Sequence, residues 1–181
     1  MRKIYYFAFF VLIIMFFVEL NVKEAMAFNY AGYRWGGNWP QVTVDYSSVA
    51  VNAWRNVIAG AMSDWNNAGA RFTFLSGSSN NKISVVWQNN NTLAMTTIHR
   101  QWWGGGNVSK VIVAINSYHP FYPADRSGYD LATVMRHEFG HWLVLNHTNP
   151  PSLMQPTLSR QEVHYVGLDD QNGIRYIYGV R

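Results

Sequence analysis

Three histidines and one glutamate between residues 137 and 147 have the types and spacing of a metal-dependent hydrolytic site. The segment begins His137-Glu138-Phe139-Gly140-His141. Residues four apart on a helix lie about 40° apart around its axis, so both imidazoles face one side and can bind zinc through nitrogen. Glu138 is offset from that face, where its carboxylate can reach a water on the metal instead of the metal itself.

His147 is the candidate third ligand. On a continuous helix it would lie about 240° around the axis from His141 and would face elsewhere. The chain must therefore turn sharply between the two residues if His147 is to join the site. Three histidine ligands leave one zinc position open for water, as a catalytic site requires.

These residue types predict hydrolysis by water, with no serine or cysteine nucleophile. Zinc would bring the pKa of a bound water down toward about 7 and polarise a substrate carbonyl. Glu138 would accept the proton of the attacking water as general base and pass it to the leaving amine. The alternative interpretation is an ordinary helix whose histidines serve only its surface or the core.

Hydrophobic periodicity predicts a single domain of mixed α/β class around these residues. The predicted strands cover residues 41–46, 71–75, 82–87, 93–100 and 110–116. The predicted helices cover the segment from Ser47 or Ser48, as caps, to about Asn67, then 131–145 with Asp130 as cap, and 168–178.

The first 27 residues are typical of a signal peptide. Arg2 and Lys3 precede an apolar run that ends at Val18, and Ala25-Met26-Ala27 fits a cleavage site. The apolar run is about 15 residues, short of the roughly 20 that a spanning helix needs. We therefore predict a signal peptide over 1–27 and one catalytic domain over 28–181, secreted, monomeric and without stable membrane association. An uncleaved anchor is the alternative.

Composition limits the other classes of function. The 181-residue chain has no cysteine, which excludes a thiolate ligand, a catalytic cysteine and cysteine-based latency, and which favours a bacterial origin for an exported protein. The net charge is +4 without a cluster of basic residues, so no nucleic-acid partner is expected. Trp102 and Trp103 could form a carbohydrate-binding surface, with packing or a cleft rim as the plainer interpretation.

The sequence resembles the metzincin clan of zinc peptidases and, within it, the matrixins. The metzincin signature is His-Glu-x-x-His-x-x-Gly-x-x-His followed by a Met-turn. Residues 137–147 match it with Val144 in place of the glycine, and Ser152-Leu153-Met154-Gln155-Pro156 resembles the Met-turn. Thr148, the first strand and the segment 168–179 are also similar to matrixins, whereas 93–129 matches loosely.

The resemblance implies a fold and a division of roles. It implies a twisted five-stranded mixed sheet on two long helices, a Met-turn, a C-terminal helix, and endopeptidase activity on extracellular polypeptides with one catalytic Zn²⁺. Met154 would form an apolar floor beneath the zinc, an ordinary core methionine being the alternative. An edge strand of that family pairs with extended substrate; here we expect it to be 93–100, with Thr96 and Thr97 as candidate substrate-binding residues.

The chain departs from the matrixin pattern at Val144. Positive φ is disfavoured for a β-branched residue, so we expect the break in the helix to shift toward Asn146.

The residues that hold a second, structural zinc in matrixins have no counterpart with the same spacing. His99 and His119 are therefore expected to be structural or surface residues. His164 is expected to be a surface residue, with a role in a substrate-binding loop as the alternative. Asp125 and Asp130 could join a Ca²⁺ site, although a solvated loop and a helix cap are the expected roles.

Two other functions stay open. A zinc-binding but catalytically inactive module that recognises a peptide or polysaccharide would not need a base at Glu138, which argues against it. A zinc hydrolase acting on something other than protein is opposed only by the resemblance.

Overall fold

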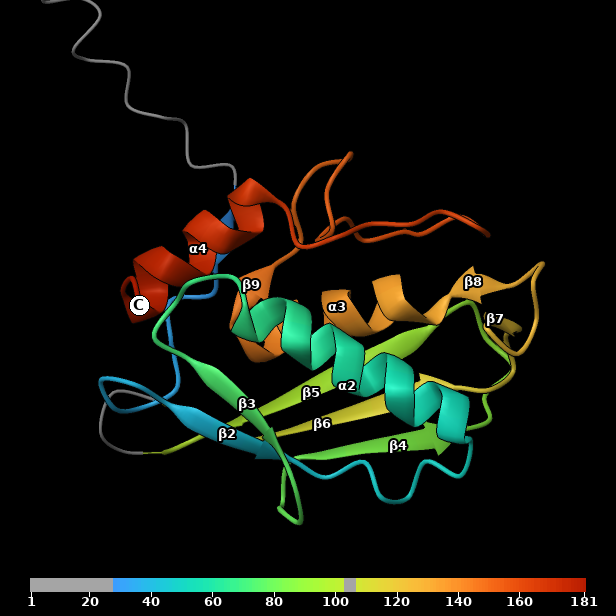
Figure 1. Ribbon diagram of the computed structural model, residues 1–181, viewed down its shortest axis with the longest axis horizontal. Coiled ribbons are helices and arrows are strands. Elements are labelled where there is room, and N and C mark those ends of the chain that lie inside the picture. The colour runs from blue at the N-terminus through green and yellow to red at the C-terminus, as the bar shows by residue number, and fades with distance from the viewer. Residues whose placement is uncertain (1–27, 103–106) are drawn as a thin grey trace, which may run out of the picture.

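The computed structural model describes residues 28–102 and 107–181 (Figure 1). The predicted signal peptide, 1–27, and Trp103 lie outside these residues. None of the helices in the described part of the chain is long and apolar enough to cross a membrane.

Short strands and three helices make up the domain, and they carry the labels of Figure 1. The strands are β1 (Asn29–Tyr30), β2 (Gln41–Val44), β3 (Thr73–Ser76), β4 (Lys82–Val86), β5 (Ala94–Arg100), β6 (Val108–Asn116), β7 (Phe121–Tyr122), β8 (Tyr129–Asp130) and β9 (Leu145–Asn146). The helices are α2 (Asn52–Asn66), α3 (Leu131–Trp142) and α4 (Leu168–Tyr178).

Five of these strands form a mixed β-layer in two pieces. β2 pairs with β3 in parallel, while β6 lies between β4, to which it is parallel, and β5, to which it is antiparallel. One isolated bridge, between Asp45 and Lys82, joins the two pieces. The mixed α/β class is confirmed, but the structure splits the expected five-stranded sheet because the Asp45 carboxylate accepts hydrogen bonds from Ser47 and turns the chain away after β2.

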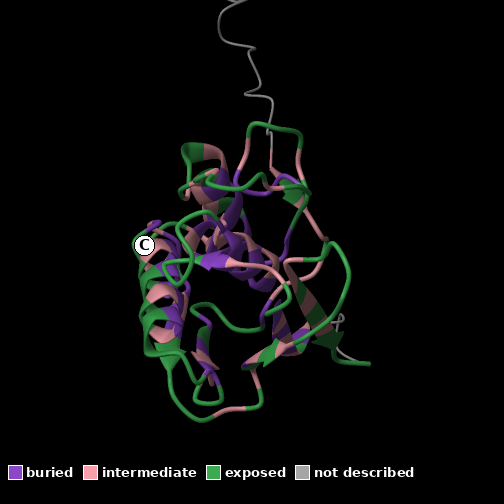
Figure 2. Cartoon of the chain, turned by 90° about the vertical axis from the view of Figure 1, so that its right-hand side faces the viewer, coloured by how far each residue is buried: buried purple, intermediate pink, exposed green. Residues whose placement is uncertain are grey.

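Helices α2 and α3 pack against each other over one face of this layer, and α3 also contacts β5 (Figure 1). The hydrophobic core lies between these two helices and the β-layer, and its residues are coloured as buried in Figure 2. It is built from apolar side chains at strand and helix positions such as Val44, Ile58, Val113 and Phe139, each fully shielded from solvent. The shorter α4 lies apart from this pair, against β1 and β9.

The helices begin and end close to the predicted residues, with two instructive differences. α2 begins after Val51 without a side-chain cap, so the predicted caps are wrong: Ser47 binds Asp45, and the Ser48 hydroxyl donates to the Ile83 carbonyl. α3 ends at Trp142, three residues earlier than predicted, because the chain enters the left-handed region at Val144.

Asp130 caps α3 as predicted. Its carboxylate accepts hydrogen bonds from the Thr133 amide at 2.8 Å and from the Thr133 hydroxyl at 2.7 Å. The cap satisfies one of the free amides of the first turn and fixes the residue at which the helix starts, and hence the direction of its later side chains.

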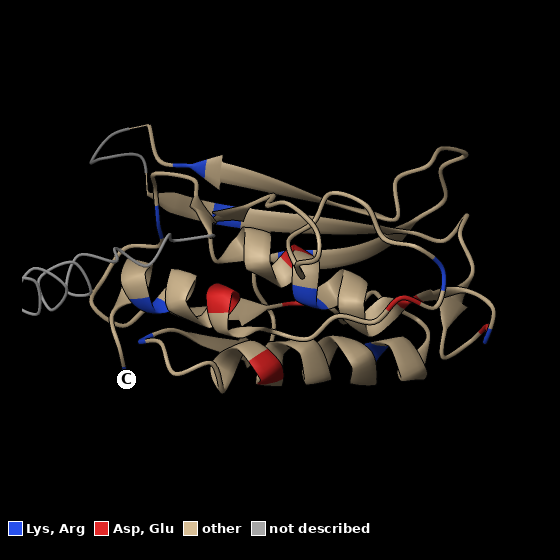
Figure 3. Cartoon of the chain, turned by 90° about the horizontal axis from the view of Figure 1, so that it is seen from above, with Lys and Arg blue, Asp and Glu red and all other residues tan. Residues whose placement is uncertain are grey.

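Charged side chains are few and are scattered over the described elements, with both signs on the helices (Figure 3). Apolar packing and neutral hydrogen bonds therefore dominate the contacts that hold the fold together.

Replacing the cap residue should weaken the fold measurably. Asp130→Ala should lower the free energy of unfolding by about 1–2 kcal/mol, because the amide and the hydroxyl of Thr133 lose a buried acceptor. Urea denaturation measures the change. Asp130→Asn is the matched control, since its amide oxygen still accepts these bonds, and equal losses in both variants would contradict the capping role.

Candidate metal centre

The helix that carries the candidate ligands is held by its apolar face. Leu131, Met135, Phe139 and Trp142 of α3 are fully buried, and the Phe139 ring lies 4.8 Å from that of Phe74. Because these residues face the core, the intervening positions, including the two histidines, are turned to another side of the helix.

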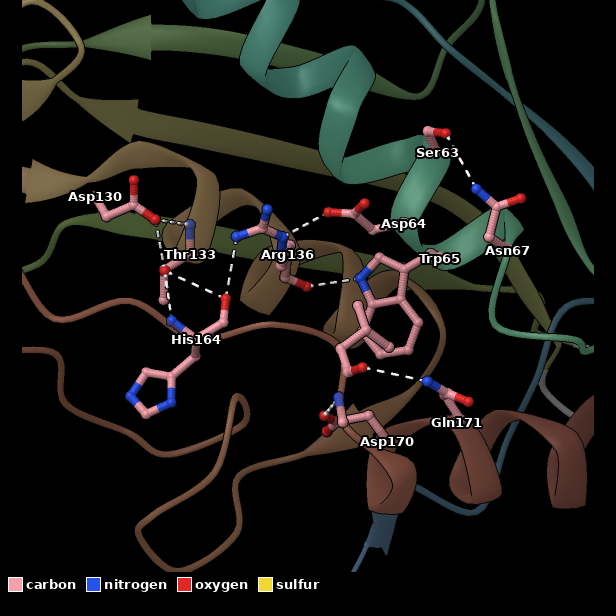
Figure 4. A network of polar contacts seen from close by, with 12 residues as sticks. Ser63, Asp64, Trp65, Asn67, Asp130, Thr133, Arg136, His164, Asp170 and Gln171 are labelled. Atoms are coloured by element: carbon pink, nitrogen blue, oxygen red, sulfur yellow. Dashed lines mark hydrogen bonds and ion pairs between the residues drawn. The ribbon is translucent and has the colours of Figure 1, made fainter.

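A polar network joins Thr133 and Arg136 of α3 to α2 and to the segment that precedes α4 (Figure 4). The Arg136 Nε donates to the Asp64 carboxylate at 2.6 Å, and the Trp65 indole donates to the Arg136 carbonyl at 2.9 Å. The Arg136 guanidinium also donates to the His164 carbonyl at 3.1 Å, while the Thr133 hydroxyl accepts from the His164 amide at 2.9 Å. The helix is thereby fixed to α2 on one side and to the segment preceding α4 on the other.

The structure brings the three predicted metal ligands together. One nitrogen from each of His137, His141 and His147 lies within 4.8 Å of the others, and the Nε2 atoms of His141 and His147 are 3.2 Å apart. The three ring centroids are 4.7–5.2 Å from one another. Among the described residues this is the one group of histidine, aspartate or glutamate side chains with metal-binding geometry.

Backbone carbonyls set the tautomers of the two helical histidines. The Nδ1 of His137 lies 2.8 Å from the Leu153 carbonyl, and the Nδ1 of His141 lies 2.8 Å from the Leu145 carbonyl. Since a carbonyl only accepts, each Nδ1 carries the proton and each Nε2 presents a lone pair to the centre of the cluster.

Burial also keeps these rings neutral. It lowers the pKa of His137 to about 4, with neighbouring His141 adding to the effect, and it lowers the pKa of His141 as well. Three imidazoles with converging nitrogens suit zinc, and their number leaves a coordination position free. The donor set therefore fits the metal that the sequence predicted.

The chain reaches His147 through a left-handed residue at Val144, with φ of 65°. The expected shift of the break to Asn146 is wrong: Asn146 lies in β9, and the valine itself occupies the conformation for which matrixins use glycine. The side chains of Leu143, Val144 and Leu145 are all buried, so apolar packing offsets the unfavourable backbone.

Glu138 lies beside the histidines with its side chain almost fully buried, at 5% exposure. Burial raises the pKa of its carboxyl to about 7, and a hydrogen bond from the Thr96 hydroxyl opposes this rise. A carboxyl group poised near neutrality can exchange protons at physiological pH.

Of the two threonines of β5, only Thr96 lies at the cleft. Thr96 contacts Glu138 and lines the cleft, whereas the Thr97 side chain is exposed and is not part of the cleft lining. Sequence reasoning placed Thr96 at the substrate and missed its contact with Glu138, because nothing in the local pattern reports a pairing across 42 residues.

Met154 packs against α3 at Gly140. Its side chain is buried, and its sulfur occupies the space where a Cβ on Gly140 would be. The Met154 carbonyl accepts a hydrogen bond from the Thr148 amide at 2.9 Å, which ties the turn to the residue after the third histidine. The contact at Gly140 is not among the features predicted from the sequence, although a glycine inside a helix is a sign of close packing.

A cleft of about 520 Å³ opens in front of the three histidines and Glu138. Its walls come from β5 and the residues before it, from β8, from α3, and from the Met-turn and the residues after it: Asn91, Thr92, Leu93, Ala94, Met95, Thr96, Tyr129, Thr133, Val134, Leu153, Gln155, Pro156, Thr157 and Leu158. Apart from Glu138 and the histidines, no side chain in this lining is charged at neutral pH.

The remaining histidine and aspartate candidates lie away from the cluster. His119 bonds the Asn90 carbonyl at 2.8 Å, and His164 pairs with Glu162 at 2.7 Å. The Asp125 carboxylate accepts from Ser127 in a turn.

His99 and Trp102 are both exposed, Trp102 at 91%. The structure joins neither of them to the cleft, and among the residues that it describes it joins Asp125 to no second carboxylate that would complete a calcium site.

Comparison with known proteins decides the family. The sequence profile of the matrixins matches residues 39–179, most of the described chain. The chain belongs to the matrixin family. A 55-residue segment is 46% identical to matrix metalloproteinase-9 of Canis lupus familiaris, and a 58-residue segment is 43% identical to matrix metalloproteinase-20 of Homo sapiens. Each segment is 30% of this matrixin but only 8% and 12%, respectively, of those longer relatives.

Close packing between the Met-turn and α3 should make Gly140 intolerant of any side chain. Gly140→Ala should lower the free energy of unfolding by about 1–3 kcal/mol, because the new methyl group displaces the Met154 side chain. Thermal and urea unfolding report the loss. Gly60→Ala is the control: a Cβ there meets no atom within 4 Å, so this exposed α2 position should gain up to about 1 kcal/mol.

The buried carboxyl and imidazole groups should give the metal-free protein opposing pH dependences. His137, with a pKa of about 4 against 6.5 when unperturbed, makes the folded chain more stable as pH rises through that range, because the unfolded chain binds more protons. Glu138, with a pKa of about 7 against 4.5, acts in the opposite direction, because the folded chain binds more protons.

Removing the carboxyl should therefore expose the contribution of the histidines. In Glu138→Gln, stability should rise more steeply with pH between about 4.5 and 6.5 than in the wild type, measured by urea unfolding in the presence of a chelator. Parallel curves for the two proteins would mean that Glu138 does not titrate as its burial indicates.

Proposed function

We propose that this matrixin is a secreted zinc-dependent endopeptidase that hydrolyses peptide bonds in extracellular proteins. The observation that carries the proposal is the convergence of three imidazole nitrogens, all within 4.8 Å of one another, beside a buried carboxyl group at the wall of a cleft. Membership of a peptidase family supports the same activity.

His137, His141 and His147 would hold the metal through the nitrogens that face one another. Bound there, zinc would supply the Lewis acidity that polarises a substrate carbonyl and lowers the pKa of water toward about 7. The protein's own contribution is to hold the rings of His137 and His141 in one tautomer, with the Nε2 lone pairs free, through the carbonyls of Leu153 and Leu145.

Glu138 is the proposed general base. Its carboxylate would take a proton from the attacking water and deliver it to the nitrogen of the leaving amine, so that one group serves both half-reactions. The Thr96 hydroxyl, donating to one carboxylate oxygen, would hold the side chain in place and leave the other oxygen for the water.

The free edge of β5 would bind the substrate as an added strand. Among the described strands, β5 is the outer strand of its sheet and pairs with β6 alone. Leu93 accepts a hydrogen bond from Asn116, so in an antiparallel ladder the odd-numbered residues of β5 bond β6. The backbone groups of Ala94, Thr96 and Ile98 therefore point to the open edge, next to the cleft.

The lining of the cleft indicates which side chains it would accept. Leu93, Val134, Leu153 and Leu158 supply apolar surface, and the remaining lining beyond the metal cluster is uncharged. A substrate residue with an apolar or uncharged side chain would enter without leaving a buried charge unpaired, whereas an aspartate or lysine would lose its hydration.

The other parts of the sequence prediction belong to the same proposal. Secretion depends on residues 1–27, and the monomeric state and the absence of membrane association after cleavage are inferred from sequence alone. The bacterial origin also stays a prediction, since the two relatives compared are mammalian. A peptide- or polysaccharide-binding module without activity would retain the zinc ligands but would have no use for the buried Glu138.

The activity is tested by combining metal analysis with an unfolded protein substrate. The purified protein should bind one zinc per chain and cleave casein or gelatin, and a chelator should abolish cleavage. Glu138→Gln should retain the zinc and lose at least about a thousandfold in kcat, because it keeps the shape of the side chain but cannot take a proton. Zinc binding without cleavage by the wild type would favour the binding module, and a fully active Glu138→Gln would refute the proposed base.

Loss of one backbone donor at the edge of β5 should weaken substrate binding. Ala94→Pro removes an amide that points to the open edge, so kcat/KM should fall about tenfold, mainly through KM. Steady-state kinetics on an extended peptide measures the change, and Ala94→Ser, which keeps the amide, is the matched control. Thr97→Ala should leave KM within about twofold, and a larger effect there than at Ala94 would place the substrate elsewhere.

A further inference from the structure

The segment at the start of the described chain pairs with the residues that lead to the third histidine. β1 runs antiparallel to β9, with Asn29 opposite Asn146, and His147 follows β9 directly. In the same register, the Ala31 amide donates to the Val144 carbonyl at 3.0 Å. These backbone contacts therefore fall on the stretch between the end of α3 and the third ligand.

The Asn29 side chain adds two polar contacts to this pairing. Its Nδ2 donates to the His147 carbonyl at 3.3 Å, and its Oδ1 accepts from the Asn146 side chain at 3.4 Å. Asn29 thus contacts both the backbone of the third ligand and the residue before it, across more than a hundred positions in sequence.

An anchor on α4 holds β1 in place. A Cβ on Gly173 would lie 2.9 Å from Phe28 and 3.0 Å from Leu145, so both side chains rest directly on this glycine. The Phe28 ring also packs against Tyr176, with centroids 5.6 Å apart. The N-terminal segment and β9 therefore both pack on α4 at Gly173, and this helix sets their relative position.

Val144 explains why this stretch needs outside support. A β-branched residue at φ of 65° favours other backbone conformations and stays there only where its surroundings hold it. Relaxation at Val144 would redirect the chain that follows and move His147 away from the two histidines of α3. The bond from Ala31 fixes the carbonyl of the strained residue itself.

We propose that residues 28–31, here called the N-terminal strap, position His147 for metal binding by holding Val144 in its left-handed conformation. Asn29 and Ala31 are positioning residues in this role and do not touch the metal. The inference rests on the proposed function, because it requires His147 to be a zinc ligand.

The test is the zinc affinity of full-length variants, measured by competition with a chromophoric chelator and independent of catalysis. Ala31→Pro removes the amide that bonds Val144, and proline is compatible with the extended residue Tyr30 before it. Its zinc dissociation constant should rise about tenfold. Ala31→Ser keeps the amide and should stay within about twofold of the wild type.

A second background separates positioning from general stability. Glycine adopts positive φ without penalty, so in Val144→Gly the strap has less strain to oppose. Ala31→Pro should then weaken zinc binding by less than about threefold. If β1 served only the overall stability of the fold, the fold-change would be the same in both backgrounds, and that result would overturn the proposal.

Milder variants keep the test decisive if Ala31→Pro does not fold. Asn29→Ala should raise the zinc dissociation constant about threefold, whereas Asn172→Ala, at an exposed position of α4, should not change it. An unchanged affinity in Asn29→Ala would count against the strap.

His147→Ala tells the two proposals apart. If it binds zinc as the wild type does, the proposed function itself fails. If it loses zinc while the strap variants all bind within about twofold of the wild type, only the role of the strap is wrong.

Discussion

The reversal of the chain between Trp142 and His147 is the constraint on which the metal centre depends. An α-helix can present two histidines four residues apart on one face, but it carries a third histidine six residues later to another side. Only a break in the helix brings His147 back, and here the break is made by Val144 in the left-handed region. The unfavourable backbone is compatible with a stable fold because the residues around it, Leu143 and Leu145, are buried in the core.

The same reversal supplies part of the support for the ligands. By turning the chain back along α3, it brings the Leu145 carbonyl to the Nδ1 of His141, and the Met-turn then brings the Leu153 carbonyl to the Nδ1 of His137. Each ring is therefore oriented by the backbone that follows the helix. Metal ligands held in this way need little rearrangement on binding, which favours both affinity and a defined geometry.

Burial decides the protonation of the groups in the site. Withdrawal from water lowers the pKa of His137 and of His141, which favours the neutral rings that metal binding requires, and it raises the pKa of the Glu138 carboxyl to about 7. Met154 contributes by filling the space beneath the helix, where Gly140 leaves room for its sulfur. The packing around α3 therefore has two results: it seats Met154 against the helix, and it sets the protonation of the buried histidines and of Glu138.

The sequence by itself determined the spacing that places two of the proposed histidine ligands on one helix face, the cap at Asp130 and the extent of the last helix. These features depend on local periodicity and capping chemistry. Contacts between distant residues were decided only by the tertiary structure. They include the bond from Thr96 to Glu138 and the pairing of β1 with β9. The position of the break is the clearest case: local preference favours Asn146 for a left-handed residue, but the packing of the surrounding leucines and the pairing with the N-terminal segment impose it on Val144.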